Sequence, residues 1–159
     1  MADKVGLTAP QQRTWLNYMR VYHRMEYEMN RQLQAECGLS LADYTVMNAL
    51  SHAPGRRLQL SALATTIGWE RSRLSHHLQR MAVRGLVERV QSETDGRATD
   101  ATLTDSGWKA LRSAAPKHAA WVSDLFFSGL AADRTVELGD LLGEVYQTIL
   151  TKGTLPTPE

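Results

Sequence analysis

The sequence predicts a mainly α-helical fold with one small β-hairpin, because of the way its apolar residues are spaced. Over most of the chain they recur every three or four positions, which places them on one face of an α-helix. From residue 86 to residue 103 they tend to recur at every second position instead, as they do in β-strands. Glycine and proline residues separate the helical segments. The spacing therefore predicts a series of helices that is interrupted once by a hairpin.

The composition fits one globular domain that spans residues 1–159. Hydrophobic residues make up 43% of the chain and charged residues 22%, which argues against intrinsic disorder. The single cysteine, Cys37, excludes an internal disulfide framework and a cysteine-rich zinc module, and it favours a reducing compartment. No targeting segment is recognisable, and no apolar run is long enough to span a membrane. We therefore expect a cytoplasmic protein without a membrane partner.

A long first helix is expected over residues 11–36, which contain neither glycine nor proline. Gly38 supplies its C-terminal stop. Its main apolar face consists of Trp15, Tyr18, Tyr22, Met25, Met29 and Leu33. A second stripe of Leu16, Met19 and Val21 widens this surface. A helix that is apolar on more than one side needs several neighbours, and one of them can come from another chain.

Three shorter helices follow. Ser40 caps the first, and residues 60–67 and 70–84 form the other two around a turn at Gly68. The last of these helices has a polar and basic face opposite its apolar stripe. That outer face is expected to hold Ser72, Arg73, His76, His77, Arg80 and Arg84. A short helix, a turn with glycine and a second helix with a basic outer face form the helix-turn-helix pattern.

A β-hairpin follows directly on this candidate recognition helix. Residues 86–90 alternate between apolar and polar, a charged turn covers residues 92–97, and the alternation resumes at residues 101–103. Arg97 lies at the tip of the hairpin. A hairpin in this position is the wing of a winged helix-turn-helix module, which we place at about residues 40–104. The connector before the helix pair has strand character at best.

Two further helices complete the chain. Pro116 lies inside the first of them, so we expect a kink or a break there. The last helix covers about residues 132–152. These terminal segments, about residues 10–37 and 105–153, bracket the winged module with large apolar faces. Because the module is too small to cover these faces, we expect them to be the dimerisation helices of a homodimer.

The charge of the chain is concentrated in its middle. The formal net charge is only +1, but residues 56–97 carry +4 and the remainder carries −3. All eight basic residues of the middle segment are arginines, whose planar side chain suits phosphates and guanine edges. The distribution of charge therefore favours double-stranded DNA as a partner, although the total does not.

Several short segments resemble the MarR family of bacterial winged-helix transcription regulators. They are residues 60–64 and 74–89, the wing sequence Asp95-Gly96-Arg97, and the pair Leu103-Thr104 followed by Gly107. The resemblance covers essentially the whole chain. It implies a homodimer whose two winged modules straddle a pseudo-palindromic operator, with half-sites about one helical turn apart.

The resemblance also implies roles for individual side chains. Three residues at the start of the recognition helix would face base edges: Ser72, Arg73 and His76. Two would contact phosphates: His77 and Arg80. Arg97 would enter the flanking minor groove, and Asp95 would orient that arginine rather than meet the DNA.

The resemblance further implies a repressor that a small, aromatic ligand releases from its operator. Candidate residues for the ligand pocket are Tyr18, Tyr22, Met25, Met47, Leu50 and Trp121. Plain core packing is the default alternative for each of them. If a ligand binds there, it would act by stabilising a dimer whose recognition helices are wrongly spaced for DNA.

Other functions have less support in the sequence. None of the five histidines forms an i, i+4 pair, so we expect no metal site and no cofactor. Cys37 is expected to be a small boundary residue rather than an oxidation sensor. The chain has no nucleophile elbow, phosphate-binding glycine loop or zinc-protease motif, so we expect no enzymatic activity. One alternative stays open, a dimeric helical protein whose winged module contacts proteins instead of DNA.

Overall fold

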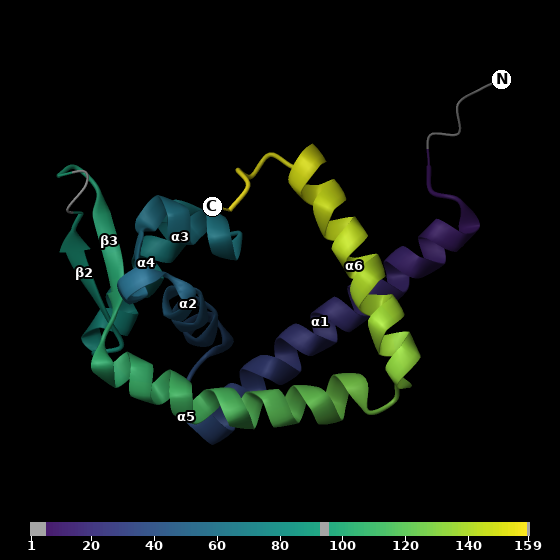
Figure 1. Cartoon of the computed structure of the whole chain (residues 1–159), viewed down its shortest axis with the longest axis horizontal. Helices are drawn as coiled ribbons and strands as arrows, with labels where there is room; N and C mark the ends of the chain where they lie inside the picture. The colour runs from purple at the N-terminus through teal and green to yellow at the C-terminus, as the bar shows by residue number, and fades with distance from the viewer. Residues whose placement is uncertain (1–5, 93–95, 159) are drawn as a thin grey trace.

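The computed structural model describes residues 6–92 and 96–158, and it is mainly helical with a small sheet at one end (Figure 1). The helices are α1 (Ala9–Cys37), α2 (Leu41–His52), α3 (Leu60–Ile67), α4 (Arg71–Val83), α5 (Asp105–Val122) and α6 (Ala132–Lys152). The strands are β1 (Arg57–Gln59), β2 (Val87–Gln91) and β3 (Thr99–Leu103). A short 3-10 turn, Pro54–Arg56, precedes β1, and a π-helical turn, Ser123–Phe127, follows α5. The predicted fold class is confirmed.

Local capping explains where α1 and α2 begin and where α1 ends. The Ser40 hydroxyl accepts a hydrogen bond from the amide of Asp43 at 3.0 Å, while the Asp43 carboxylate accepts one from the amide of Ser40 at 2.9 Å. Thr8 and Gln11 form the same reciprocal box at the start of α1. Gly38 ends α1 in the left-handed conformation, with φ of 66°, which glycine adopts without strain.

The sheet has one more strand than the predicted hairpin. Its order is β1-β3-β2, and both pairings are antiparallel. Ala101 of β3 lies opposite Leu58 on one side and Arg89 on the other. The connector before α3 therefore does form a strand, because β3 offers it a free edge.

One hydrophobic core holds α2, α3, α4, the sheet and the first half of α5 together. Its largest fully buried apolar side chains are Val46, Met47, Leu50, Leu63, Leu74, Leu78, Met81 and Val87. The start of α5 lies close to the end of α4. The Thr104 hydroxyl donates to the carbonyl of Gly85 at 2.6 Å, and a Cβ on Gly107 would collide with the carbonyl of Leu86. This close approach explains why glycine follows the Leu103-Thr104 pair.

The break considered at Pro116 does not occur. Helix α5 continues from Asp105 to Val122, and residues just after the proline are held against α1. Nδ1 of His118 lies 2.9 Å from Oε1 of Gln32, and Nζ of Lys117 donates to the carbonyl of Glu36 at 3.3 Å. These contacts between helices stabilise a continuation that the isolated segment would disfavour.

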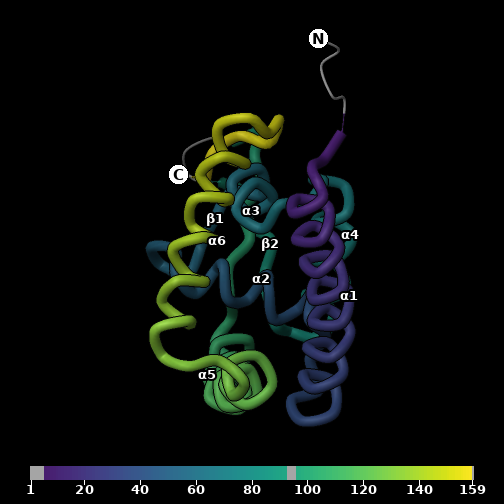
Figure 2. The backbone as a smooth tube through the Cα atoms, turned by 90° about the vertical axis from the view of Figure 1, so that its right-hand side faces the viewer, coloured from purple at the N-terminus to yellow at the C-terminus, as the bar shows by residue number. Residues whose placement is uncertain are grey.

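Helices α1 and α6 run along opposite sides of the molecule (Figure 2). Both helices carry large apolar side chains that are about half exposed or more. On α1 these are Trp15, Leu16, Tyr18, Val21, Tyr22 and Tyr27; on α6 they are Val136, Leu141, Leu142, Val145, Tyr146 and Ile149. Within the described part of the chain, no helix combines the length and the apolarity that crossing a membrane requires.

Candidate nucleic-acid interface

Helix α4 presents a polar face to solvent and an apolar face to the core. Gly68, with φ of 68°, ends α3 and lets the chain turn sharply into α4. Leu74, Leu78 and Met81 are completely buried. The side chains on the other face are exposed, and they include four of the five contact residues predicted on this helix: Ser72, Arg73, His76 and Arg80. After the turn between α3 and α4, these four side chains thus point to solvent.

His77 does not belong to the outer face, and its predicted placement there is wrong. The residue is only 7% exposed. Its Nε2 lies 3.0 Å from Oδ1 of Asp43, and its Nδ1 lies 2.9 Å from Nη2 of Arg80. His77 is three residues after Leu74 and four before Met81, so helical geometry places it on the core stripe. A side chain buried in this way cannot contact a phosphate, but it can fix Arg80.

Asp43 is the buried acid that joins the start of α2 to α4. Besides His77, it contacts Arg84, whose Nη1 donates to its Oδ2 at 2.6 Å. Nη2 of Arg84 donates to the carbonyl of Gly38 at 2.9 Å, so the exposed Arg84 side chain is tied to the fold at both terminal nitrogens. Burial alone would raise the pKa of Asp43, but the contacts with His77, Ser40 and Arg84 outweigh it and hold the pKa well below its usual value.

Trp69 is a residue of this surface that the sequence pattern did not single out. Cζ of Arg73 lies 4.1 Å from the centre of the Trp69 ring, which is a cation-π contact. The ring also meets His77 edge to face, with centroids 5.6 Å apart. An aromatic residue four positions before an arginine at a helix start is the signal that could have revealed this pair.

The wing arginine lies beside the start of α4. Arg97 is exposed, and together with Arg71 it lines a polar hollow of about 200 Å³. Gln59, at the end of β1, and Ser61, in the first turn of α3, also line it. Asp95, the predicted orienting residue, lies outside the described residues. The structure thus brings Arg97 to the same side of the module as the start of the recognition helix.

Ion pairs tie some of the central arginines to the fold. Among residues 6–92 and 96–158 these are Arg56 with Asp105 at 3.4 Å, Arg57 with Asp100 at 2.7 Å, and Arg84 with Asp43 at 2.6 Å. The side chains of the other central arginines are exposed on α4, on β2 and in the hairpin turn, and they are Arg71, Arg73, Arg80, Arg89 and Arg97. Part of the positive charge of the middle segment is therefore structural, and the exposed remainder is what a polyanion would meet.

The predicted ligand-pocket residues lie in different surroundings. Met47 and Leu50 are completely buried in the core, whereas Tyr18 and Tyr22 are about half exposed on α1. Trp121 lies on α5 and stacks on His118, with centroids 5.8 Å apart. For Met47 and Leu50, the core-packing alternative describes the structure.

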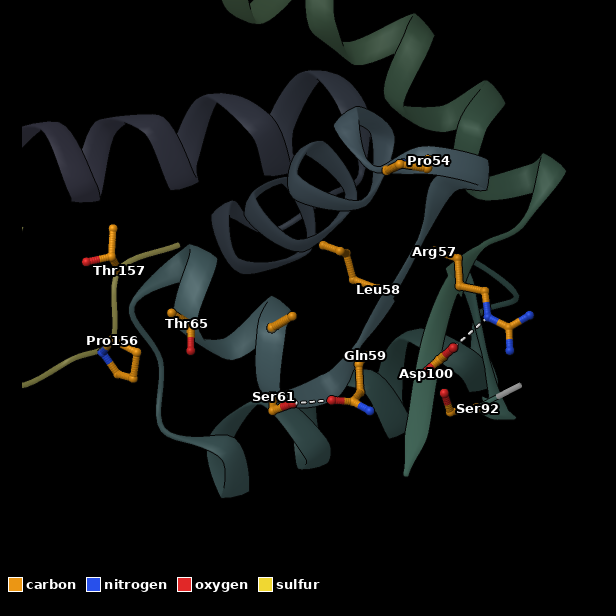
Figure 3. A pocket seen from close by; sticks show the side chains of 11 residues that line it. Pro54, Arg57, Leu58, Gln59, Ser61, Thr65, Ser92, Asp100, Pro156 and Thr157 are labelled. Atoms are coloured by element: carbon orange, nitrogen blue, oxygen red, sulfur yellow. Dashed lines mark hydrogen bonds and ion pairs between the residues drawn. The ribbon is translucent and has the colours of Figure 1, made fainter. Parts of the chain in front are cut away.

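A larger cavity lies elsewhere, between β1, α3 and the C-terminal tail, and has a volume of about 610 Å³ (Figure 3). Leu58 and Ala62 form its apolar wall, and Pro156 closes it from the tail. Figure 3 shows Arg57 reaching across to Asp100 at one end. None of the predicted pocket residues lines it.

His118 lies at the junction of α1, α2 and α5. Its ring meets Tyr44 at a centroid distance of 4.8 Å, and burial lowers its pKa. Burial, and secondly the neighbouring Cys37, raise the pKa of Tyr44. Cys37 itself is a half-buried free thiol. Among residues 6–92 and 96–158, no three histidine, cysteine or acidic side chains are grouped as metal ligands would be.

Comparison with known proteins identifies close structural relatives. The sequence pattern of the MarR family matches residues 38–98. Sco3205, a MarR family transcriptional regulator from Streptomyces coelicolor whose crystal structure contains DNA, is 33% identical, with a TM-score of 0.86. The match covers 95% of this chain and 98% of that one. AbsC, another MarR family regulator from Streptomyces coelicolor, is also 33% identical, with a TM-score of 0.82 over 91% of this chain and 97% of that one.

A more distant relative shares the fold. The organohalide-sensing regulator RdhR-CbdbA1625, in its 2,4-dichlorophenol-bound form, is 19% identical and has a TM-score of 0.79. The match covers 99% of this chain and 95% of that one. No curated protein sequence matches the chain.

Proposed function

Because the chain belongs to the MarR family of transcriptional regulators, we propose that it binds double-stranded DNA in a sequence-specific manner and acts as a ligand-responsive repressor. The observation that carries this proposal is the relative Sco3205, which is 33% identical over almost the whole chain and whose structure contains DNA. Arg71 of α4 and Arg97 of the wing line one hollow, which brings exposed positive charge of the recognition helix and of the wing together, as phosphate contacts require.

The proposed contacts follow from the exposed faces. Ser72, Arg73 and His76 lie in the first turns of α4 and would read base edges in the major groove. Arg80 lies further along the helix and would contact a phosphate. Arg97 would enter the minor groove beside it, where its charge is attracted most strongly at A·T-rich sequence. Asp95 keeps its proposed role as the residue that orients Arg97.

We propose that the functional unit is a homodimer built on the two terminal regions, α1 together with α5 and α6. Support comes from the many large apolar side chains of α1 and α6 that are about half exposed or more in the single chain, as expected of helices that a partner covers. A two-fold dimer would present two copies of α4 to successive major grooves. The operator should then be pseudo-palindromic, with half-sites about one helical turn, ~34 Å, apart.

The alternative of a winged module that contacts proteins is not favoured, because the DNA complex is formed by a relative with the same fold and 33% identity. The family consists of transcriptional regulators, and we propose that this chain likewise works by binding rather than by catalysis. The proposed DNA partner also implies the location of the protein in the cell, because a bacterial regulator meets its operator in the cytoplasm.

We also propose that a small aromatic molecule lowers its affinity for DNA. The relative RdhR-CbdbA1625 binds 2,4-dichlorophenol, and in this chain aromatic side chains are available at the helix junction and on α1: Tyr18, Tyr22, His118 and Trp121. Titrating a chain–operator complex with a panel of phenols and aromatic acids tests this. Release of DNA by one of them supports the proposal, and retention of DNA throughout the panel contradicts it.

Selection of bound fragments from random duplex DNA tests DNA binding itself. We expect enrichment of an inverted repeat whose half-sites are about 10 base pairs apart. A fold-preserving variant with Arg73→Ala and Arg97→Ala serves as the matched control and should enrich nothing. Failure of the wild-type chain to enrich any sequence would contradict the proposed function.

A further inference from the structure

Trp69 lies between the core and the outer face of α4, and its position is fixed on several sides. Its amide donates to the carbonyl of Ala64 at 2.9 Å, directly after the left-handed turn at Gly68. Its ring packs against the core and meets His77 edge to face. His77 is itself held by the buried carboxylate of Asp43. The indole therefore forms a rigid platform at the start of the recognition helix.

Arg73 is the side chain that rests on this platform. Its Cζ lies 4.1 Å from the centre of the ring, and within the described part of the chain its guanidinium makes no hydrogen bond or ion pair. The contact uses the π face of the indole, and it occupies none of the five N–H donors of the arginine. These donors remain available for a base edge, and their fork matches the paired acceptors of guanine.

We propose that Trp69 is a positioning residue that holds Arg73 for base readout and so sets the sequence preference at one base pair of each half-site. The inference rests on the proposed DNA binding. A long flexible side chain loses rotamer freedom when it docks, and a platform that restricts it beforehand reduces this loss. Truncating Trp69 should therefore weaken the readout by Arg73 without changing any direct contact with DNA.

Two substitutions separate a platform from a space-filling core residue. Trp69→Phe keeps an aromatic face, whereas Trp69→Leu keeps apolar volume but removes the π system. If Trp69 only filled space, Leu and Phe would behave alike. If it positions Arg73, the phenylalanine variant should retain most of the readout and the leucine variant should lose it.

The first measurement needs no DNA. In the free protein, the ring current of Trp69 should shift the Cδ protons of Arg73 upfield in the NMR spectrum. Trp69→Leu should return these protons to their ordinary positions, and Trp69→Phe should retain part of the shift. Unshifted Arg73 protons in the wild type would overturn the proposal, even if the chain binds DNA.

The second measurement compares affinities for the selected operator and for its single-base variants. Trp69→Leu should reduce discrimination about tenfold at the base pair that Arg73→Ala also relaxes, and leave the other positions unchanged. The double variant should lose no more than Arg73→Ala alone, because both changes remove one interaction. Equal losses on all sequences, or additive losses, would overturn the proposal.

Circular dichroism and sedimentation establish that each variant is a folded dimer. If Trp69→Leu does not fold, Trp69→Phe is used for the test. Trp69→Phe should then show a smaller loss of discrimination at the same base pair. A loss of affinity that is equal at all positions would overturn the proposal. Absence of DNA binding by the wild type would overturn the proposed function and this inference together. Wild-type binding with unaltered discrimination in the Trp69 variants would overturn the inference alone.

Discussion

Nε2 of His77 lies 3.0 Å from Oδ1 of Asp43, so the recognition helix is joined to the start of α2 by a buried polar pair. Asp43 is 2% exposed, and Arg84 approaches its other oxygen at 2.6 Å. Removing one member of a buried ionic network leaves the others without compensation. Asp43→Asn should therefore lower the free energy of unfolding by about 3 kcal/mol, measured by denaturant titration at pH 7. A loss below about 0.5 kcal/mol, typical of a surface site, would contradict this role.

The same carboxylate predicts a dependence of stability on pH. The pKa of Asp43 is lowered in the folded chain, so its contribution is complete above its unfolded pKa of about 3.9 and is lost as the pH falls further. The difference in unfolding free energy between the wild type and Asp43→Asn should then shrink between pH 5 and pH 2. A difference that stays constant over this range would mean that Asp43 does not titrate in this way.

His77 and Arg80 should respond differently to substitution. His77→Ala removes a buried side chain and should cost about 2 kcal/mol of stability. Arg80→Ala should leave stability nearly unchanged and make the slope of log K against log salt shallower by about one. Because His77 acts on DNA only through Arg80, the double variant should have the same slope as Arg80→Ala. A double variant with a still shallower slope would restore the phosphate role that the burial of His77 argues against.

The exposed face of α6 is the place to test dimerisation. Val145 is 56% exposed in the single chain, and a carboxylate at this position would have to be buried in the proposed interface. Val145→Asp should produce monomers at micromolar concentration in sedimentation experiments. Gln147→Asp, two positions along the same helix and on its other side, is the matched control and should remain dimeric. If both variants remain dimeric, the interface does not include the face of α6 that holds Val145.

Arg97 of the wing is expected to contribute more on some sequences than on others. Arg97→Ala should weaken operator binding by about 1–3 kcal/mol, with the larger loss on sites flanked by A·T base pairs. Arg134→Ala on α6, whose arginine pairs with Glu137 at 2.6 Å, is a distant control for lost charge. Unchanged binding by a folded Arg97→Ala dimer would rule out the wing contact.

Much of the fold could be predicted from the sequence because its signals are local. The spacing of apolar residues predicts the helices, and residues such as Ser40 and Gly38 predict where helices begin and end. Features that depend on distant partners could not be read in this way. Strand β1 exists because β3 pairs with it, and α5 passes through Pro116 because α1 holds the residues beyond it.

The candidate site was predictable to a similar degree. The exposed placement of Ser72, Arg73, His76 and Arg80 follows from helical periodicity. The polarity of His77 favours the outer face and its spacing from Leu74 favours the core stripe, and the partner that decides between them, Asp43, lies far away in the sequence. The pairing of Trp69 with Arg73 is local, but an aromatic residue just before a helix more often packs in the core than supports an exposed arginine.

The salt dependence of DNA binding shows whether the exposed arginines contact phosphates. Fluorescence anisotropy with the selected operator gives the association constant over a range of salt concentrations. If the exposed arginines of α4 and the wing neutralise phosphates, log K should fall linearly with log salt, by about 0.9 for each phosphate contacted. For a dimer we expect a total slope of about −4 or steeper. A slope near zero, or no binding at low salt, would contradict DNA binding through these arginines.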